Sequence, residues 1–330
     1  MKLSLCVDMY GCPNRCKHCW LGHMPNRNME EGSDEMIMDF FSPYFEEIDF
    51  YSWLREPDYC DHYEGRWKRD IGVSKNTIPE RFELASFWRI VRDENYIPFL
   101  KKTGVKKVQL TLFGTGDIQD FYVGRKGAYR EVLKATDLLI EGGIIPRWQC
   151  FINEENKEEI VKILHLYEEY KKKCPEMEFF VHEGTCDGEN EKLYPVRIEK
   201  DDIPKELIPY YLEYESVLTE RECVELLKEE DSHPSFCFED DPVLYISNTY
   251  DVFFNFTHMK KEWKIGNLRE DTSEEIMRRI TEGDTYALRS AKDVTWKKLV
   301  QMYGDPDSEK VFRLDDYKMY LFNSYLEGGK

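Results

Sequence analysis

The sequence has no apolar run that approaches the roughly 20 residues a membrane-spanning helix needs. Its N-terminus also lacks the hydrophobic segment and cleavage site of a signal peptide. Positive charge is scarce, because 46 Lys and Arg residues stand against 65 Asp and Glu residues, a formal net charge of −19. We therefore expect a cytoplasmic protein with no membrane partner. Nucleic acid is an unfavourable partner, because its phosphates would be repelled.

Internal repeats and low-complexity tracts are absent as well. With 330 residues, 41% of them hydrophobic, the chain can form one large domain or one domain with a small appendage. The ten cysteines are expected to be thiols or metal ligands rather than disulfides in a reducing compartment. Most of those scattered along the chain are expected to be small buried apolar residues. They are Cys6, Cys60, Cys150, Cys174, Cys186, Cys223 and Cys237.

Three further cysteines stand close together near the start of the chain. Cys12, Cys16 and Cys19 follow the strand-like apolar run 3–7 with the spacing Cys-x3-Cys-x2-Cys. Thiolates gathered on one loop suit an iron–sulfur cluster or zinc. Structural zinc takes four ligands, and no fourth cysteine follows at the spacing of a zinc finger. A four-iron cluster held by three thiolates keeps one iron open for chemistry.

This spacing, closed by the aromatic Trp20, resembles the signature of the radical S-adenosylmethionine (SAM) superfamily. The resemblance implies that Cys12, Cys16 and Cys19 bind one [4Fe-4S] cluster, with Trp20 in the cofactor site. It implies that the amino and carboxylate groups of SAM chelate the open iron. An electron, supplied by a donor such as flavodoxin or ferredoxin, then splits SAM to a 5'-deoxyadenosyl radical. The alternative from another class is a zinc-binding scaffold without catalysis.

Strands and helices alternate over the first two-thirds of the chain, which is typical of an α/β protein built from parallel βαβ units. We expect strands at 3–9, 49–54, 107–113, 145–152 and 177–182, and helices at 33–46, 80–102, 127–141, 157–173 and 219–229. A polar, aromatic-rich insertion covers about 59–79. The resemblance implies a partial (β/α)6 TIM-like barrel over 1–230, with its chemistry at the C-terminal ends of the strands.

The end of the second expected strand reads Leu54-Arg55-Glu56-Pro57, where radical SAM proteins commonly carry Gly-Gly-Glu-Pro. By this resemblance Glu56 binds the SAM amino group, although both glycines are replaced. A competing segment is Gly114-Thr115-Gly116-Asp117 after the third strand. We prefer Glu56 because strand order is the stronger constraint, and we expect Gly114 and Gly116 to lie beside the cofactor as small residues.

Alternation along the later strands indicates which side chains face the barrel interior. These are Gln109, Thr111 and Phe113, then Arg147, Gln149 and Phe151, then Phe180 and His182. Buried polar groups need partners. Arg147 is expected to pair with the SAM carboxylate and Gln149 to bond its ribose, or both belong to a structural network.

The polar loop 183–191 is expected to contact substrate, and His182 and Cys186 are candidate catalytic residues. The reaction class stays open among dehydrogenation, epimerisation and bond formation. An epimerase would need a hydrogen donor, for which Cys186, Cys150 and Cys60 are candidates.

Residues 231–330 resemble the SPASM or twitch extension of radical SAM enzymes. We expect strands at 243–246 and 250–254, a turn at 265–268 and a helix from 273. No cysteine follows Cys237, so we expect an extension without a second cluster. The extension invites comparison with peptide-modifying and natural-product enzymes. The first strand begins at the N-terminus, with no room for a leader-peptide-binding domain. That favours a small-molecule substrate, and a maturase of ribosomal peptides is the alternative.

Overall fold

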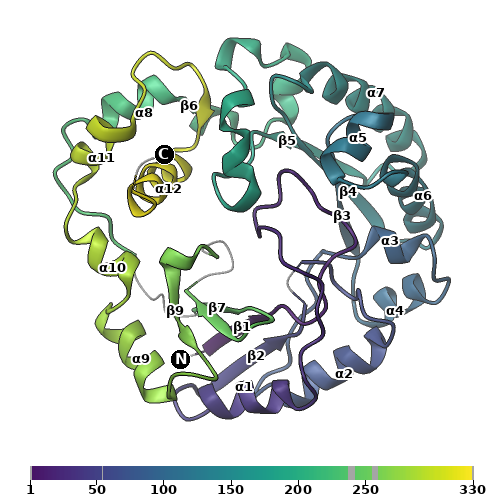
Figure 1. Ribbon diagram of the computed structural model, residues 1–330. Coiled ribbons are helices and arrows are strands. Elements are labelled where there is room, and N and C mark those ends of the chain that lie inside the picture. The colour runs from purple at the N-terminus through teal and green to yellow at the C-terminus, as the bar shows by residue number, and fades with distance from the viewer. Residues whose placement is uncertain (1, 54, 237–241, 255–258, 329–330) are drawn as a thin grey trace.

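The computed structural model describes residues 2–53, 55–236, 242–254 and 259–328. Strands and helices alternate along the chain, and the helices form an outer ring around the strands (Figure 1). The segment that carries the three cysteines crosses the middle of this view, inside the ring.

Five parallel strands form the first part of the structure, in two groups. The first group pairs β1 (Lys2–Val7) with β2 (Glu47–Tyr51), and α1 (Ser33–Phe41) connects them. The second group is β3 (Lys107–Leu112), β4 (Ile145–Phe151) and β5 (Glu178–His182). These parallel strand–helix units confirm the predicted α/β fold class.

The helices between the later strands bury the outer face of their sheet. On β3, Val108, Leu110 and Leu112 are almost fully buried against α6 (Ala128–Glu141) and α7 (Lys157–Lys173) in one core. Trp148 on β4 belongs to the same core. Side chains alternate along a strand, so the intervening polar residues face the opposite way, toward the interior.

The C-terminal part continues the first sheet. Strand β7 (Val243–Ile246) pairs with β1 in parallel, and β8 (Asp251–Phe253) and β9 (Lys264–Asn267) follow as antiparallel neighbours. The strand order is β2-β1-β7-β8-β9. Helix α9 (Ser273–Glu282) begins with a capping box between Thr272 and Glu275. The expected extension therefore shares a sheet with the start of the chain.

Several local predictions differ from the structure. The insertion at 59–79 contains a helix, α2 (Tyr63–Val73), and a further unpredicted helix, α5 (Gly116–Val123), follows β3. The long helix expected at 80–102 is reduced to α3 (Phe87–Ile90) and α4 (Tyr96–Lys102). Part of that stretch runs beside β3 instead, since the backbone of Glu83 accepts a hydrogen bond from the Gln109 amide. This tertiary contact overrides local helix propensity.

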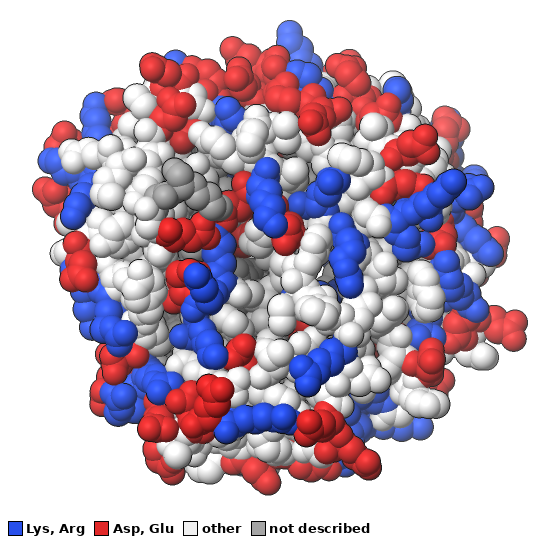
Figure 2. Space-filling view, in the orientation of Figure 1, with Lys and Arg blue, Asp and Glu red and all other residues white. Residues whose placement is uncertain are grey.

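The remaining helices and strands lie in the C-terminal half of the chain. The helices are α8 (Glu220–Leu227), α10 (Tyr286–Ala291), α11 (Trp296–Tyr303) and α12 (Leu314–Leu326), and β6 (Leu218–Thr219) pairs with β10 (Val311–Phe312). Among the described residues, no helix is both long enough and apolar enough to cross a membrane. On the face drawn in Figure 2, Lys and Arg side chains are interspersed with Asp and Glu.

Candidate cofactor site

A cavity of about 360 Å³ lies at the C-terminal ends of β3, β4 and β5. Its walls come from the cysteine loop, from the segment after β2, and from the inner faces of these strands. The lining includes Cys12, Cys16, His18, Cys19, Trp20, Arg55, Glu56, Gln109, Thr111, Phe113, Gln149, Phe151, His182 and Thr185. The structure thus gathers most of the predicted site residues around one space.

All three predicted cluster ligands line this cavity and are free thiols. Burial raises the pKa of each thiol, and Glu56 and a neighbouring thiol raise the pKa of Cys12 and Cys16 further, whereas Arg55 opposes the effect of burial at Cys19. Three thiols in such a place ionise readily only when a cationic group binds them. No three of the described His, Cys, Asp and Glu side chains are arranged as ligands of one metal ion. Three soft donors around an open cavity do fit the ligand chemistry of an iron–sulfur cluster.

The cysteine loop is held in place by buried contacts. Arg55 forms a buried ion pair with Asp8 at the end of β1, and its guanidinium donates to the carbonyl oxygens of Leu21 and Gly22 at 3.0 and 2.9 Å. Gly11 has φ +100°, and a Cβ there would lie 2.2 Å from Asn26 Oδ1. Only glycine fits that position, directly before the first cysteine. Arg55 therefore has a structural role in place of the expected glycine.

Glu56 is the most unusual acidic group in the cavity wall. Its Oε2 lies 3.9 Å from Cys12 Sγ, and its buried Oε1 has no hydrogen-bond partner among the described residues. Burial raises the pKa of Glu56 to about 7, against smaller opposing contributions from Ser86, Arg125 and Cys12. A buried carboxyl oxygen without a partner is costly. A bound ammonium group would supply the missing partner.

The inner faces of β3, β4 and β5 carry a continuous polar ladder. Arg147 donates to Gln109 at 2.8 Å, Gln109 donates to Gln149, and Gln149 contacts His182 Nε2 at 2.5 Å. Burial lowers the pKa of His182 to about 3, with smaller contributions from Arg313 and Arg197. The imidazole is therefore neutral at physiological pH, and its Nδ1 accepts a hydrogen bond from the Gly184 amide at 3.2 Å.

Similar solved structures show what this architecture is. Native anSMEcpe with bound AdoMet (SAM), an anaerobic sulfatase-maturating enzyme, matches with a TM-score of 0.54 at 15% identity, over 99% of this chain and 98% of that one. Its complex with AdoMet and the Cp18Cys peptide matches with a TM-score of 0.51 at 14% identity, over 99% of both chains. Streptococcus suis SuiB bound to precursor peptide SuiA matches with a TM-score of 0.50 at 13% identity, over 83% of this chain and 63% of that one.

The chain has the radical SAM fold. No protein-family model matches the chain, and neither does any curated protein sequence.

Glu56 lines the cavity, whereas no residue of the competing segment 114–117 does. Asp117 is exposed in the first turn of α5, and neither Gly114 nor Gly116 lines the cavity. A Cβ on Gly114 would instead meet Ile118 and Glu159 at 2.7 and 2.9 Å. The expectation that Gly114 and Gly116 lie beside the cofactor is not supported, because their loop packs on α7.

Arg147 also differs from its prediction. It lies near the start of β4, outside the cavity lining, and its guanidinium pairs with Glu83 at 2.7 Å and donates to Gln109. The predicted contact with a SAM carboxylate is not supported, because this cation already has a carboxylate partner. The alternative of a structural network describes Arg147 better. Gln149 and Trp20 both line the cavity.

The candidate hydrogen-donor thiols lie outside the cavity. Cys186 and Cys150 are buried in the main core, and burial raises the pKa of both thiols. Cys60 lines a different, more open pocket. Cys186 is thus a core residue in this structure, whereas His182 remains a candidate. Leu54, Cys237 and the segment 255–258 lie outside the described residues.

Sequence reasoning missed His18, which lies between the second and third cysteines. Its ring centroid is 4.0 Å from that of Phe113 and 4.4 Å from that of Phe151, and its buried Nδ1 has no partner among the described residues. Burial lowers the pKa of His18 well below its usual value, so the ring is neutral. Its place inside the cysteine motif was the signal that could have revealed it.

Proposed function

We propose that this chain is a radical SAM enzyme that binds one [4Fe-4S] cluster through Cys12, Cys16 and Cys19 and holds SAM in the 360 Å³ cavity. The observation that carries the proposal is the meeting of three thiols and the partnerless Glu56 carboxyl oxygen in one cavity of a radical SAM fold. When bound, these cofactors supply the electron and the sulfonium from which a 5'-deoxyadenosyl radical arises.

The chain's own residues bind and orient the cofactor in this proposal. Glu56 accepts hydrogen bonds from the SAM ammonium group, a charge-assisted contact in a largely dry wall. Gln149 offers polar atoms to the ribose from the strand ladder. The stack of His18, Phe113 and Phe151 gives the cavity an apolar side that excludes water.

For the substrate we favour a peptide or peptide-like molecule. Two of the similar structures hold peptides, the Cp18Cys peptide and the precursor SuiA. This outweighs the expectation of a small molecule, which rested only on where the first strand begins. Neutral His182 at the end of β5 is the candidate to contact the reacting substrate.

The C-terminal part is proposed to be a SPASM-like or twitch-like extension without a cluster of its own. The pairing of β7 with β1 ties it to the barrel, and Cys223 is fully buried in the core on α8. The electron is proposed to come from a small redox protein such as flavodoxin or ferredoxin.

The test is anaerobic reconstitution with iron and sulfide, followed by reduction in the presence of SAM. We expect brown protein that forms 5'-deoxyadenosine, and a Cys16→Ala variant that forms none. Cys174→Ala is the matched control, because Cys174 ends α7 outside the cavity and should leave cleavage unchanged. Wild-type cleavage by Cys16→Ala would refute the proposal. Colourless protein with stoichiometric zinc would support the scaffold alternative.

A further inference from the structure

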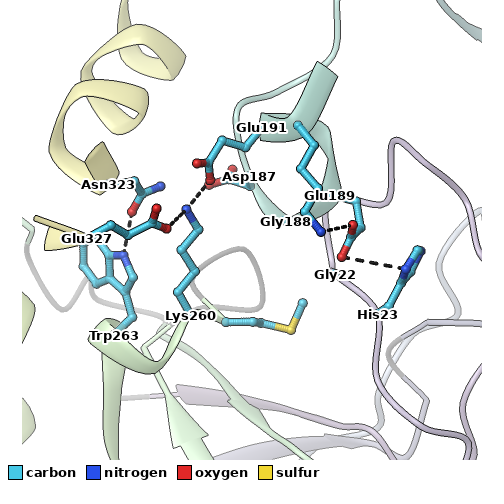
Figure 3. A pocket seen from close by; sticks show the side chains of 12 residues that line it. Gly22, His23, Asp187, Gly188, Glu189, Glu191, Lys260, Trp263, Asn323 and Glu327 are labelled. Atoms are coloured by element: carbon cyan, nitrogen blue, oxygen red, sulfur yellow. Dashed lines mark hydrogen bonds and ion pairs between the residues drawn. The ribbon is translucent and has the colours of Figure 1, made fainter. Parts of the chain in front are cut away.

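A second pocket, of about 260 Å³, adjoins the cofactor cavity. It lies between the loop after β5 and the C-terminal segments that carry Lys260 and Glu327 (Figure 3). Gly22 and His23 of the cysteine loop line both the pocket and the larger cavity. A molecule bound in the pocket would therefore lie next to the proposed cluster and SAM.

Most charges in this pocket already have partners. Lys260 binds Glu191 and, at 2.6 Å, Glu327. Glu189 accepts a hydrogen bond from Lys192 at 2.6 Å and faces His23 Nδ1 at 3.7 Å. Figure 3 shows the Lys260 side chain reaching toward the carboxylates of Glu191 and Glu327, with Asp187 beside Glu191.

Asp187 is the exception. Only 8% of it is exposed, it lines the pocket, and its carboxyl group makes no hydrogen bond or ion pair with a described residue. Burial raises the pKa of Asp187 to about 7, and the nearby Asp316 and Glu191 raise it while Lys260 lowers it. A buried carboxylate of this kind is stabilised by a cation that comes close to it.

The loop that carries Asp187 is also built to stay close to the cysteine loop. Gly188 has φ +58°, and a Cβ there would lie 2.4 Å from the Cys19 carbonyl oxygen. The Glu189 amide donates to that same oxygen at 2.8 Å. Asp187 is thus fixed relative to the proposed cluster ligands, as a substrate-positioning group needs to be.

We propose that this pocket binds a positively charged group of the substrate, an ammonium or a guanidinium, with Asp187 as its counter-ion. The rest of the substrate would then pass Gly22 and His23 into the larger cavity. The inference rests on the proposed function, because it places the substrate beside SAM. It narrows the substrate class to molecules with a cationic group, such as peptides that contain Lys or Arg.

The experiment measures binding of model compounds to the reconstituted protein with SAM, without reductant, by saturation-transfer NMR titration. The probes are the N-acetyl, N-methylamide derivatives of lysine and arginine, and the matching norleucine derivative is the uncharged control. We expect at least one cationic probe to bind about tenfold or more tightly than norleucine, and Asp187→Asn to abolish that difference. Asp201→Asn, an exposed carboxylate in a 3-10 turn, is the matched control for net charge and should bind as wild type does.

Equal binding of the norleucine and cationic probes to the wild-type protein would overturn the proposal, and so would full retention of cation binding in Asp187→Asn. If Asp187→Asn does not fold, the salt dependence of probe binding to the wild-type protein tests the proposal instead. Raising ionic strength about tenfold should weaken the cationic probes and leave norleucine unchanged, and no difference between them would refute the idea. Cation binding needs no cleavage of SAM. Protein that cleaves SAM but binds no cation would contradict this inference alone, and protein that binds cations without cleaving SAM would contradict the proposed function.

Discussion

Replacing Glu56 by Gln tests the cofactor site most directly. The change keeps the size of the side chain and removes the charge that we assign to the SAM ammonium group. Burial holds the pKa of Glu56 at about 7 instead of its ordinary 4.5, which corresponds to about 3 kcal/mol of unfavourable ionisation. A bound ammonium recovers an energy of this order. We therefore expect Glu56→Gln to weaken SAM binding on the order of a hundredfold.

The assay is equilibrium binding of SAM to the reconstituted protein, with the cluster absorbance recorded in the same samples. The cluster absorbance distinguishes a loss of SAM affinity from a loss of the cluster. This check is needed because Glu56 Oε2 lies 3.9 Å from Cys12 Sγ, so the change could disturb the cluster itself. Glu56→Asp keeps the charge but draws it back by one methylene, so it should restore part of the affinity.

Asp117→Asn is the matched control, since Asp117 is an exposed acidic residue in the first turn of α5. We expect it to leave the affinity within about twofold of wild type, as surface substitutions usually do. If Asp117→Asn instead weakens SAM binding more than Glu56→Gln does, the loop after β3 binds the amino group and our reasoning is wrong.

Three further predictions concern stability and metal content. Arg55→Met leaves Asp8 buried without its partner, so the free energy of unfolding in denaturant should fall by about 3 kcal/mol or more. The control Arg278→Met, at an exposed site, should change the free energy of unfolding by less than about 0.5 kcal/mol. A loss below about 1 kcal/mol for Arg55→Met would contradict this prediction. Burial lowers the pKa of His182 to about 3 in the folded protein, against an ordinary pKa of 6.5. At a pH below 6.5 the unfolded chain therefore binds a proton at His182 that the folded protein does not, so stability is lost as the pH falls. Between about pH 7.5 and pH 5, wild-type protein should lose about 2 kcal/mol more than His182→Gln, and parallel pH profiles would refute the assignment. Iron analysis of reconstituted protein should approach about four per chain; about eight would show that Cys237 and other cysteines hold a second cluster.

The sequence alone was enough for the features that are local along the chain. The three cysteines lie within eight residues, so their gathering on one loop needs no knowledge of the fold. The two-residue period of a strand was likewise sufficient to turn Gln109, Gln149 and His182 toward the interior, where the structure has them lining the cavity. Helix α7 has the bounds that its sequence pattern predicted.

Glu56 shows which properties of a residue follow from its sequence position and which follow from tertiary packing. Its position after the second strand was the reason to prefer it over Asp117, and the structure places Glu56, but not Asp117, in the cavity wall. Its burial and its partnerless oxygen depend on packing among the cysteine loop, Ser86 and Arg125, which are far apart in sequence. Local pattern predicts where a side chain is attached, whereas tertiary packing sets its solvation.

Only the tertiary structure decided the roles that depend on distant partners. The sequence left Arg147 as a possible cofactor ligand, but in the structure its guanidinium pairs with Glu83, from the segment before α3. The pairing of β7 with β1 joins residues more than 200 positions apart, and it carries Lys260 to the loop that holds Asp187. No periodicity encodes such encounters, because an ion pair or a strand pairing is set by which surfaces meet when the whole chain packs. The sequence by itself therefore determined the gathering of the three cysteines on one loop and the faces of the strands. The tertiary structure determined which charged groups were left to bind a ligand.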